Sequence, residues 1–434
     1  MEEFGEMKPI KVGLLGLGTV GTGVVRIIEG HREDLRRRAG CPIQIGKILV
    51  RDRNKRRNIA VAPELLTEDP WDIINDPDID VVIEVMGGVE QTKTYLMECL
   101  DKGKQVITAN KDLMALHGSQ ILAKAAERGC DVMYEASVAG GIPIIRTLTN
   151  GFSSDRITKI MGIVNGTTNY ILTKMSEEGA DYLEVLKEAQ RLGYAEADPT
   201  SDVEGLDAAR KMAILASLGF HTDVSLDDVT VQGITKVTKE DILYGKKLGY
   251  QIKLLGIAEC RDGQISVSVG PTMVKDTHPL ATVGGVYNAV YVYGEAVGET
   301  MFYGPGAGEL PTAASVVADL VAVSKNIRMG VCGRNVMIPY KEKILKSDDQ
   351  IAYKNFILLH VEDRAGVLAK ISEVFSRHEV SLESVLQHPN PSNPKAELII
   401  ITHDANLASM KKVLNDFKSL DVIHEIKGVY RVEG

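Results

Sequence analysis

The sequence predicts an α/β protein with a doubly wound parallel sheet, a second α+β domain and a small C-terminal βαββαβ domain. Between Ile10 and about Val138, short β-branched apolar runs alternate with charged, helix-like segments, as in βαβ units around a parallel sheet. Residues 351–434 follow the order strand, helix, strand, strand, helix, strand. At roughly 150 residues per domain, a chain of 434 residues allows about three domains.

The expected boundaries follow from these patterns. Residues 1–142 form the parallel-sheet domain, 143–303 the second domain and 351–434 the last domain; 331–350 form a linker, because this stretch turns polar and rich in Lys. The expected strands of the parallel sheet are Ile10–Leu15, Ile43–Val50, Ile79–Val85, Gln105–Thr108 and Asp131–Tyr134.

The composition indicates a protein that acts on small molecules. Fifty basic and fifty-nine acidic side chains give a net charge of -9, which disfavours binding to nucleic acid or anionic lipid. The five cysteines lie far apart without a Cys-x-x-Cys pair, as is typical of a reducing compartment. The start of the chain lacks the apolar stretch of a signal peptide. We therefore expect a cytoplasmic protein without nucleic-acid or membrane partners.

A glycine-rich loop follows the first expected strand. Gly16, Gly18 and Gly21 form the pattern G-x-G-x-x-G between an apolar strand and an amphipathic helix. In a Rossmann domain the first glycine permits a tight turn, the second lets the backbone approach a pyrophosphate, and the third lets helix and strand pack closely. The loop therefore predicts dinucleotide binding through Gly16, Leu17, Gly18, Thr19, Val20 and Gly21.

The ends of later strands supply further candidate cofactor residues. Arg51, at the tip of the second strand, favours NADP because an arginine there pairs with a 2′-phosphate; the alternative is that Asp52 holds the ribose of NAD and the nearby bases are solvated. Gly87, Thr108 and Lys111 follow two other strands at the same carboxyl edge, where ordinary turn chemistry is the competing interpretation.

The densest polar cluster is the segment 193–211. Asp207 and Lys211 are four positions apart and share one helix face, which on its own most often means a surface salt bridge. The helix continues with almost only apolar residues to Gly219, which indicates burial. The preceding loop carries Glu196, Asp198 and Asp202, so several carboxylates lie near one ammonium and suit a substrate with a cationic amine.

These motifs, in this order, resemble those of homoserine dehydrogenase in its monofunctional form with a C-terminal regulatory domain. The resemblance rests on Gly16–Gly21, Thr108–Lys111, Glu135–Pro143, Asn165–Asn169 and Gly193–Lys211. It implies reversible hydride transfer between NAD(P)H and L-aspartate 4-semialdehyde to give L-homoserine, in the biosynthesis of threonine, methionine and isoleucine. A nearby ammonium can stabilise the alkoxide that forms and supply its proton.

The resemblance also implies roles for individual residues. Lys211 is the expected proton donor, and Lys111, the other candidate, lies near nicotinamide and substrate. Glu196 and Asp207 would bind the amino or hydroxyl group of the substrate, and Asp202 would support the lysines.

Three further features follow from the same resemblance. Glu135, Val138, Gly140 and Ile142 match positions that hold a monovalent cation, Na or K, largely through backbone carbonyls; the alternative is a plain loop. Residues 304–330 return to complete the nucleotide-binding domain, and Gly308 approaches the cofactor. A homodimer through the middle domain is expected, or a homotetramer if the C-terminal domains also pair.

The C-terminal domain resembles an ACT domain in the segment 361–368. Gly366 permits close approach at a helix N-terminus, which suits an amino-acid carboxylate. We expect an effector site for an amino acid such as L-threonine; the alternative is a dimerising sheet that has lost its ligand, and the long turn 389–394 leaves the specificity open. The candidate effector residues are Asp363, Ala365, Gly366 and Val367.

Two rival functions make different demands on the sequence. An aldehyde-oxidising semialdehyde dehydrogenase needs a thioester-forming cysteine beside a base, and no cysteine lies in the polar cluster. A non-catalytic regulator that binds nucleotide and amino acid would have no need of Glu196, Asp207 and Lys211 together.

Overall fold

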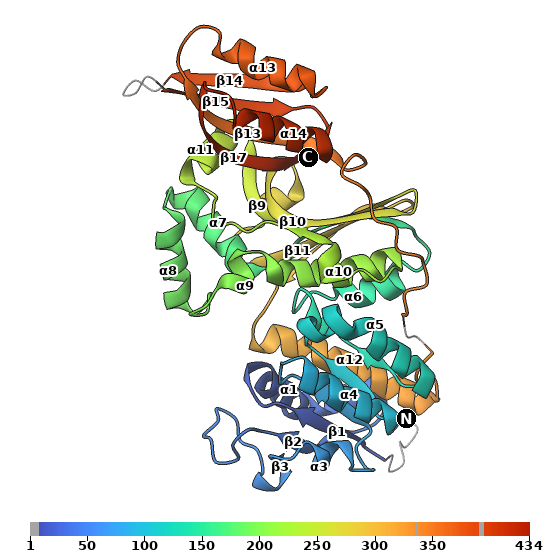
Figure 1. Cartoon of the computed structure of the whole chain (residues 1–434). Helices are drawn as coiled ribbons and strands as arrows, with labels where there is room; N and C mark the ends of the chain where they lie inside the picture. Colours follow the sequence, from blue (N-terminus) through green and yellow to red (C-terminus); the bar gives the residue numbers. More distant parts are fainter. Residues whose placement is uncertain (1–7, 335–336, 390–394) are drawn as a thin grey trace. The chain divides into compact units, whose positions relative to one another are not determined.

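The computed structural model describes residues 8–334, 337–389 and 395–434 (Figure 1). These residues form two compact units. Unit 1 contains the described residues of Met1–Ile160, Arg210–Asp227 and Asn288–Glu342. Unit 2 contains those of Met161–Ala209, Asp228–Tyr287 and Lys343–Gly434. The chain passes from one unit to the other within β7 (Ile157–Ile163), α10 (Leu206–Phe220) and β11 (Tyr287–Gly294).

Unit 1 is built on a six-stranded parallel sheet with the order β3-β2-β1-β4-β5-β6. Its direction of winding reverses between β1 and β4, and ligands of such sheets bind at the carboxyl ends of the strands near that point. The five expected strands are present, and the sequence patterns missed the two-residue β3. The strands are β1 (Ile10–Leu15), β2 (Ile43–Leu49), β3 (Leu66–Thr67), β4 (Val81–Glu84), β5 (Gln105–Thr108) and β6 (Val132–Met133).

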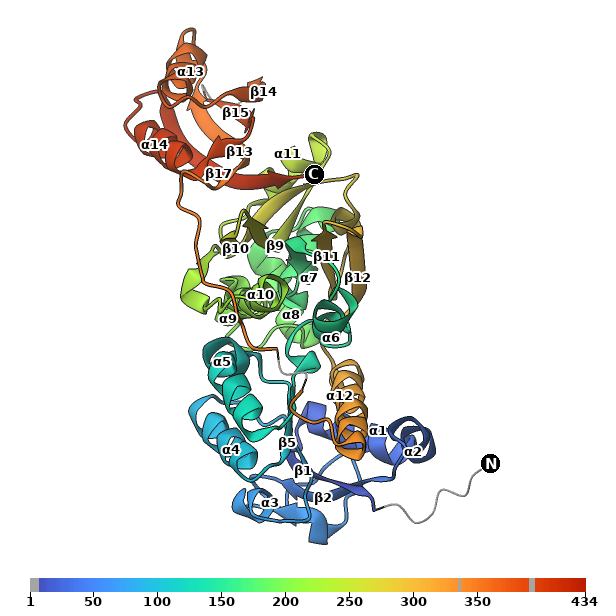
Figure 2. The ribbon, with the colours of Figure 1, turned by 90° about the vertical axis from the view of Figure 1, so that its right-hand side faces the viewer.

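Helices cover both faces of this sheet. Figure 2 shows α4 and α5 on one face and α1, α2 and α12 on the other. The helices of unit 1 are α1 (Thr19–Gly30), α2 (Arg32–Ala39), α3 (Trp71–Ile74), α4 (Glu90–Asp101), α5 (Lys111–Arg128), α6 (Ile144–Arg146) and α12 (Glu309–Met329). This unit also contains the π-helical turn Thr147–Gly151, the strand β12 (Gly298–Pro305) and short 3-10 turns at Pro63–Leu65 and Glu135–Ser137. A further 3-10 turn, Pro279–Thr282, lies in unit 2.

Helix α12 comes from a distant part of the sequence and packs on α1. Val316 and Leu320 of α12 share one buried cluster with Val24 of α1 and Val12 of β1. The approach is close because Gly23 has no side chain: a Cβ there would lie 2.7 Å from the carbonyl oxygen of Glu309. The helix begins at Glu309 and contains Pro311 in its first turn, where proline is tolerated because the backbone N–H groups there have no partner within the helix.

Unit 2 contains the C-terminal domain, and its βαββαβ order is confirmed. The strand order within the unit is β9-β10-β17-β13-β15-β14, so the last strand, β17, pairs in parallel with β10 of the middle region. Arg431 of β17 binds Glu259 of β9 at 2.7 Å. The elements of unit 2 are α7 (Gly166–Glu178), α8 (Tyr182–Leu192), α9 (Thr200–Val203), β8 (Val229–Val231), α11 (Lys239–Lys247), β9 (Tyr250–Arg261), β10 (Gln264–Lys275), β13 (Ala352–Glu362), α13 (Val367–Arg377), β14 (Leu382–Pro389), β15 (Lys395–Thr402), β16 (Ala405–Asn406), α14 (Leu407–Phe417) and β17 (Ile423–Glu433).

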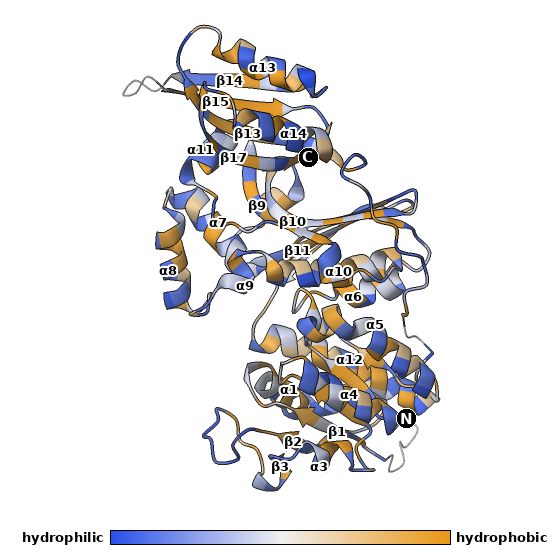
Figure 3. Ribbon diagram, viewed as in Figure 1, coloured by the Kyte–Doolittle hydropathy of each residue, from blue (hydrophilic) through white to orange (hydrophobic). Residues whose placement is uncertain are grey.

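The central strands of the C-terminal domain are hydrophobic along most of their length (Figure 3). Leu359 of β13 and Ile400 of β15 are buried against Phe375 of α13 and Phe417 of α14. Of the expected long turn at 389–394, residues 390–394 lie outside the described part of the chain.

The described residues of the expected linker, 331–334 and 337–350, have little regular structure but contact their surroundings. The ring of Tyr340 stacks on that of His221 with their centres 4.9 Å apart, and Lys341 forms an isolated bridge with Thr222. Farther along, Leu345 forms a bridge with Ile265. No helix in the described part of the chain is both long and apolar enough to span a bilayer.

Candidate active site

The glycine loop has the geometry that dinucleotide binding requires. Gly16 has φ +110°, and Gly21 lies so close to it that a Cβ on Gly21 would be 2.2 Å from the Gly16 carbonyl oxygen. Gly18 begins α1 as its N-cap, and a Cβ there would meet no atom within 4 Å. The first and third glycines are therefore required by packing, while the second faces open space, as expected where a pyrophosphate approaches the backbone.

A cavity of about 530 Å³ opens beside this loop. Its lining includes Gly18, Arg51, Asp52, Glu68 and Tyr95. The Asp52 carboxylate accepts a hydrogen bond from the backbone N–H of Asn54 at 2.7 Å, so one of its oxygens is used within its own turn. No described residue forms a hydrogen bond or ion pair with the Arg51 guanidinium.

A buried carboxylate organises the carboxyl edge of β4 and β5. Glu84 accepts hydrogen bonds from the backbone N–H groups of Met86 and Gly87 at 2.9 and 3.0 Å and from the Thr108 hydroxyl at 2.5 Å. Burial raises the pKa of Glu84, and the Thr108 hydrogen bond opposes this shift. Asn110 donates to the Gly88 carbonyl at 2.7 Å and caps α5, whose first residue is Lys111. The sequence flagged Gly87, Thr108 and Lys111 but not the roles of Glu84 and Asn110.

A cluster of carboxylates lies in unit 2 around Asn165. The Asn165 amide donates to Asp202 at 2.7 Å and to Asp207 at 2.8 Å, so these two acidic residues are brought together. Asp207 is 5% exposed and Asp202 is half-buried. The sequence pattern flagged both aspartates, whereas Asn165 was named only within the motif Asn165–Asn169 and was given no role, because an Asn before a helix is ordinarily only a cap.

The loop before α9 supplies the remaining acidic residues. Asp198 accepts hydrogen bonds from the hydroxyl and the backbone N–H of Thr200. These bonds lower the pKa of Asp198, and its carboxylate therefore serves to stabilise the loop. The Glu196 side chain is exposed, and no described residue donates a hydrogen bond to its carboxylate. Glu196 is therefore the carboxylate of this loop that is available to a ligand.

Helix α10 carries both Asp207 and Lys211 and is buried along most of its length, as expected. The buried residues include Met212, Leu215 and Phe220. Lys211 is half-buried, so the environment is not that of a solvated surface pair.

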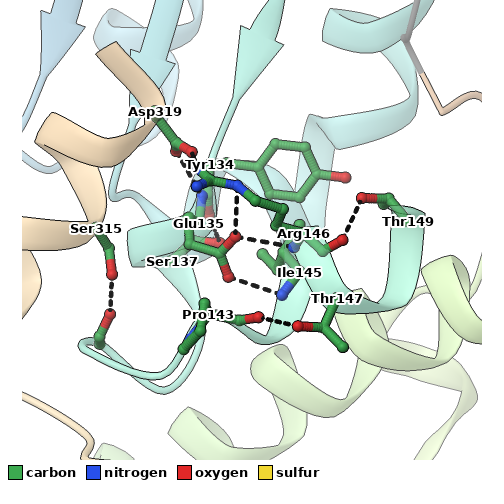
Figure 4. A network of polar contacts seen from close by, with 11 residues as sticks. Tyr134, Glu135, Ser137, Pro143, Ile145, Arg146, Thr147, Thr149, Ser315 and Asp319 are labelled. Atoms are coloured by element: carbon green, nitrogen blue, oxygen red, sulfur yellow. Dashed lines mark hydrogen bonds and ion pairs between the residues drawn. The ribbon is translucent and has the colours of Figure 1, made fainter. Parts of the chain in front are cut away.

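The segment expected to hold a cation, residues 135–142, takes part in a second buried network of hydrogen bonds and ion pairs (Figure 4). The Glu135 carboxylate accepts the backbone N–H groups of Ile145 and Arg146, each at 2.8 Å. Arg146 binds Asp319 of α12 at 2.6 Å, and Asp319 accepts the backbone N–H of Glu135 at 2.9 Å. Burial raises the pKa of Glu135, and burial with the Glu135 charge raises that of Asp319 to about 7.

The backbone of the same segment is tightly constrained. Gly140 has φ +46°, and a Cβ there would lie 2.4 Å from the Gly306 carbonyl oxygen. The Gly140 carbonyl accepts the Ser315 hydroxyl at 2.7 Å, and that of Ile142 accepts Ile144 N–H at 2.8 Å. A carbonyl oxygen has two lone pairs. The segment therefore fits a cation held by carbonyl groups, although its one acidic side chain, Glu135, is already engaged.

The expected effector loop precedes α13 in the C-terminal domain. Gly366 caps that helix with φ +89°, and Asp363 and Ala365 are exposed beside it while Val367 is buried. Asp363 accepts a hydrogen bond from Gln387 of β14 at 3.1 Å.

Four of the five cysteines have thiols whose pKa is raised, which disfavours a reactive thiolate. Cys41, Cys99 and Cys130 are buried, and burial raises the pKa of all three, that of Cys99 to about 12. Burial also raises the pKa of Cys332 to about 11. Among the described residues, no group of His, Cys, Asp and Glu side chains could hold a metal ion. The raised thiol pKa values disfavour thioester chemistry at Cys41, Cys99, Cys130 and Cys332.

The parallel sheet, the glycine loop and the adjoining cavity define a protein of the Rossmann class with a dinucleotide-binding domain. Comparisons with known proteins identify its family. A model of "Homoserine dehydrogenase, NAD binding domain" matches residues 16–135, one of "Homoserine dehydrogenase" matches 143–321, and one of "ACT domain" matches 356–422.

Relatives match over the whole chain. Homoserine dehydrogenase of Bacillus subtilis is 58% identical over 99% of both chains, and that of Corynebacterium glutamicum is 42% identical over 98% of this chain and 96% of the relative. The crystal structure of a homoserine dehydrogenase from Thiobacillus denitrificans matches with a TM-score of 0.93 and 39% identity over 99% of both chains. The chain therefore belongs to the homoserine dehydrogenase family. It is an NAD(P)-dependent oxidoreductase of aspartate-family amino-acid biosynthesis that interconverts L-aspartate 4-semialdehyde and L-homoserine.

Proposed function

We propose that Lys211 protonates the substrate oxygen during this reaction, with Lys111 placed near nicotinamide and substrate. When bound, the dinucleotide supplies or accepts the hydride at the carbonyl carbon. The negative charge that develops on the oxygen needs a cation and a proton, and a half-buried ammonium supplies both.

The observation that carries this proposal is the arrangement on α10. Asp207 and Lys211 lie one helical turn apart, and Asn165 joins Asp207 to Asp202. In our proposal Asp207 and Glu196 bind the substrate's amino or hydroxyl group, and Asp202 supports the charge of the lysines. Glu196 supports this role because it is exposed and without a described partner.

Lys211→Ala tests the assignment. We expect turnover to fall by about 100-fold or more, because the removed group acts in the transition state, while NADPH binding measured by fluorescence stays within about twofold. Lys187→Ala, which removes an exposed lysine of α8, is the matched control and should keep normal turnover. Near-normal turnover of Lys211→Ala would reject the role of this lysine.

The preferred cofactor is proposed to be NADP, with NAD also accepted. Support comes from Arg51, which lines the cavity with no described partner, while Asp52 is hydrogen-bonded within its own turn. A solved archaeal homoserine dehydrogenase that is 26% identical over 73% of this chain, with a TM-score of 0.62, is described as a complex with NADPH. The cofactor would be held by the residues from Gly16 to Gly21 and by Arg51, Gly87, Thr108, Lys111 and Gly308.

A cation and an amino-acid effector complete the proposal. A monovalent cation, Na or K, would bind at Glu135, Val138, Gly140 and Ile142, where the carbonyls of Gly140 and Ile142 each keep a lone pair. An amino-acid effector such as L-threonine would bind the C-terminal domain at Asp363, Ala365, Gly366 and Val367. Gly366 is the N-cap of α13 and has no side chain, so a carboxylate can approach the backbone N–H groups at the start of that helix. Activity assayed with and without L-threonine tests the second site, and an enzyme that does not respond would reject it.

A further inference from the structure

Asn165 performs two tasks at the start of α7. Its side-chain oxygen accepts the backbone N–H of Thr168 at 2.9 Å and the Thr168 hydroxyl at 2.8 Å, which caps the helix. Its amide nitrogen donates to Asp202 and Asp207 at 2.7 and 2.8 Å. Asn165 is 5% exposed, so both tasks take place away from bulk water.

The cap fixes which end of the amide faces the carboxylates. The Thr168 N–H requires an acceptor, so the oxygen of Asn165 must point into α7 and the NH2 group must point outward. The two hydrogens of that NH2 group each serve one carboxylate, Asp202 on α9 and Asp207 on α10. One side chain therefore sets the separation of two acidic groups that belong to different helices.

Two carboxylates that accept from the same amide group raise each other's pKa unless donors or cations compensate their charge. A neutral amide that donates to both favours their ionised forms and adds no positive charge to compete with a cationic substrate.

We propose that Asn165 is a positioning residue that holds Asp202 and Asp207 at a fixed separation for the substrate's ammonium group. This inference rests on the proposed role of Asp207 in substrate binding. It predicts an effect on substrate affinity and on the pH profile, which a purely structural helix cap would not alter.

Two substitutions separate the two tasks of Asn165. Asn165→Ser keeps a capping oxygen and removes the NH2 group that reaches both carboxylates, and we expect KM for L-homoserine to rise by about 10-fold, as for the loss of hydrogen bonds to charged groups. Asn165→Asp keeps the cap and adds a third carboxylate, and we expect a rise of about 100-fold. In both variants the acidic limb of kcat/KM should move to higher pH, because the carboxylates lose a donor that favours their ionised forms.

Asn406 provides the matched control. It caps α14 of the C-terminal domain by accepting the Ser409 N–H at 2.7 Å, as Asn165 caps α7. Asn406→Ser and Asn406→Asp should change the thermal midpoint about as much as the Asn165 variants do and leave KM and the pH profile within about twofold.

The proposal is overturned if the Asn165 variants change only the thermal midpoint and keep a normal KM and pH profile. It is equally overturned if both Asn165 variants lose NADPH affinity as well as showing a raised KM for L-homoserine, since that result would mean that the substitutions disrupt the fold in general. Asp207→Asn tests the underlying function separately: a normal KM in that variant would reject substrate binding by Asp207, whatever the Asn165 variants show.

Discussion

The buried pair Glu135 and Asp319 makes the stability of unit 1 depend on pH. Asp319 is 2% exposed, and burial and the neighbouring Glu135 charge raise its pKa to about 7 from a usual value of 3.8. Below about pH 4 the group is protonated in folded and unfolded chains alike. Between pH 4 and 7 only the folded protein holds the proton, so stability falls as the pH rises, and above pH 7 the loss is complete.

The size of this effect follows from the two pKa values. A pKa of about 7 instead of 3.8 corresponds to about 4 kcal/mol of stability lost between pH 4 and 8. Asp319→Asn cannot ionise, and its one oxygen can accept from either Arg146 or the Glu135 N–H, which in the natural protein bond to different carboxylate oxygens. The stability of the variant relative to the natural protein should therefore rise by about 2 to 4 kcal/mol between pH 5 and pH 8.

The single tryptophan makes the measurement specific to unit 1. Trp71 is the only tryptophan of the chain and lies in α3, so its fluorescence during urea unfolding reports on the parallel-sheet region. Asp349→Asn, at an exposed position, controls for the change of charge. A stability difference between Asp319→Asn and the natural protein that is the same at pH 5 and pH 8 would refute the reasoning.

Other predictions concern the ligands. Arg51→Ala should weaken NADPH binding by about 10-fold and leave NADH binding within about twofold, and equal losses for both cofactors would refute the phosphate role. Gly18→Val should remove binding of both cofactors without loss of folding, because its Cβ would meet no described atom within 4 Å; Gly30→Val, also in open space, should bind normally. Gly366→Val should abolish any response to L-threonine and keep basal turnover, and an unchanged response would exclude this loop. Replacing Na and K by a bulky organic cation should lower activity, and indifference to the exchange would contradict a catalytic role for the ion.

Local patterns in the sequence were sufficient for the strands and for the residues of the glycine loop. β1 and β5 begin and end where the apolar runs do, and Gly21 is required by its contact with Gly16 five residues earlier. Gly16 itself is required by its φ of +110° and by its approach to the backbone of Met86, which the pattern G-x-G-x-x-G indicates only indirectly. The two-residue β3 escaped because such a short strand has no periodicity.

Interactions between distant segments could not be predicted in this way. The contact of Arg146 with Asp319 joins residues 173 positions apart, and the hydrogen bond from Asn165 to Asp207 joins residues 42 positions apart. The pairing of β17 with β10 was also unexpected, because each strand could equally have been the edge strand of a separate sheet. The roles of Lys211 and Lys111 remain predictions, since spacing along a helix indicates a shared face and not a protonation step.

Amine rescue of Lys211→Ala tests most directly whether this lysine supplies the proton. Small primary alkylamines added to the variant should restore part of its turnover, with an effect that rises with amine concentration and depends on the pKa of the amine. Lys111→Ala under the same conditions should respond less. Rescue of Lys111→Ala alone, with Lys211→Ala inert to every amine while it still binds NADPH, would contradict the account.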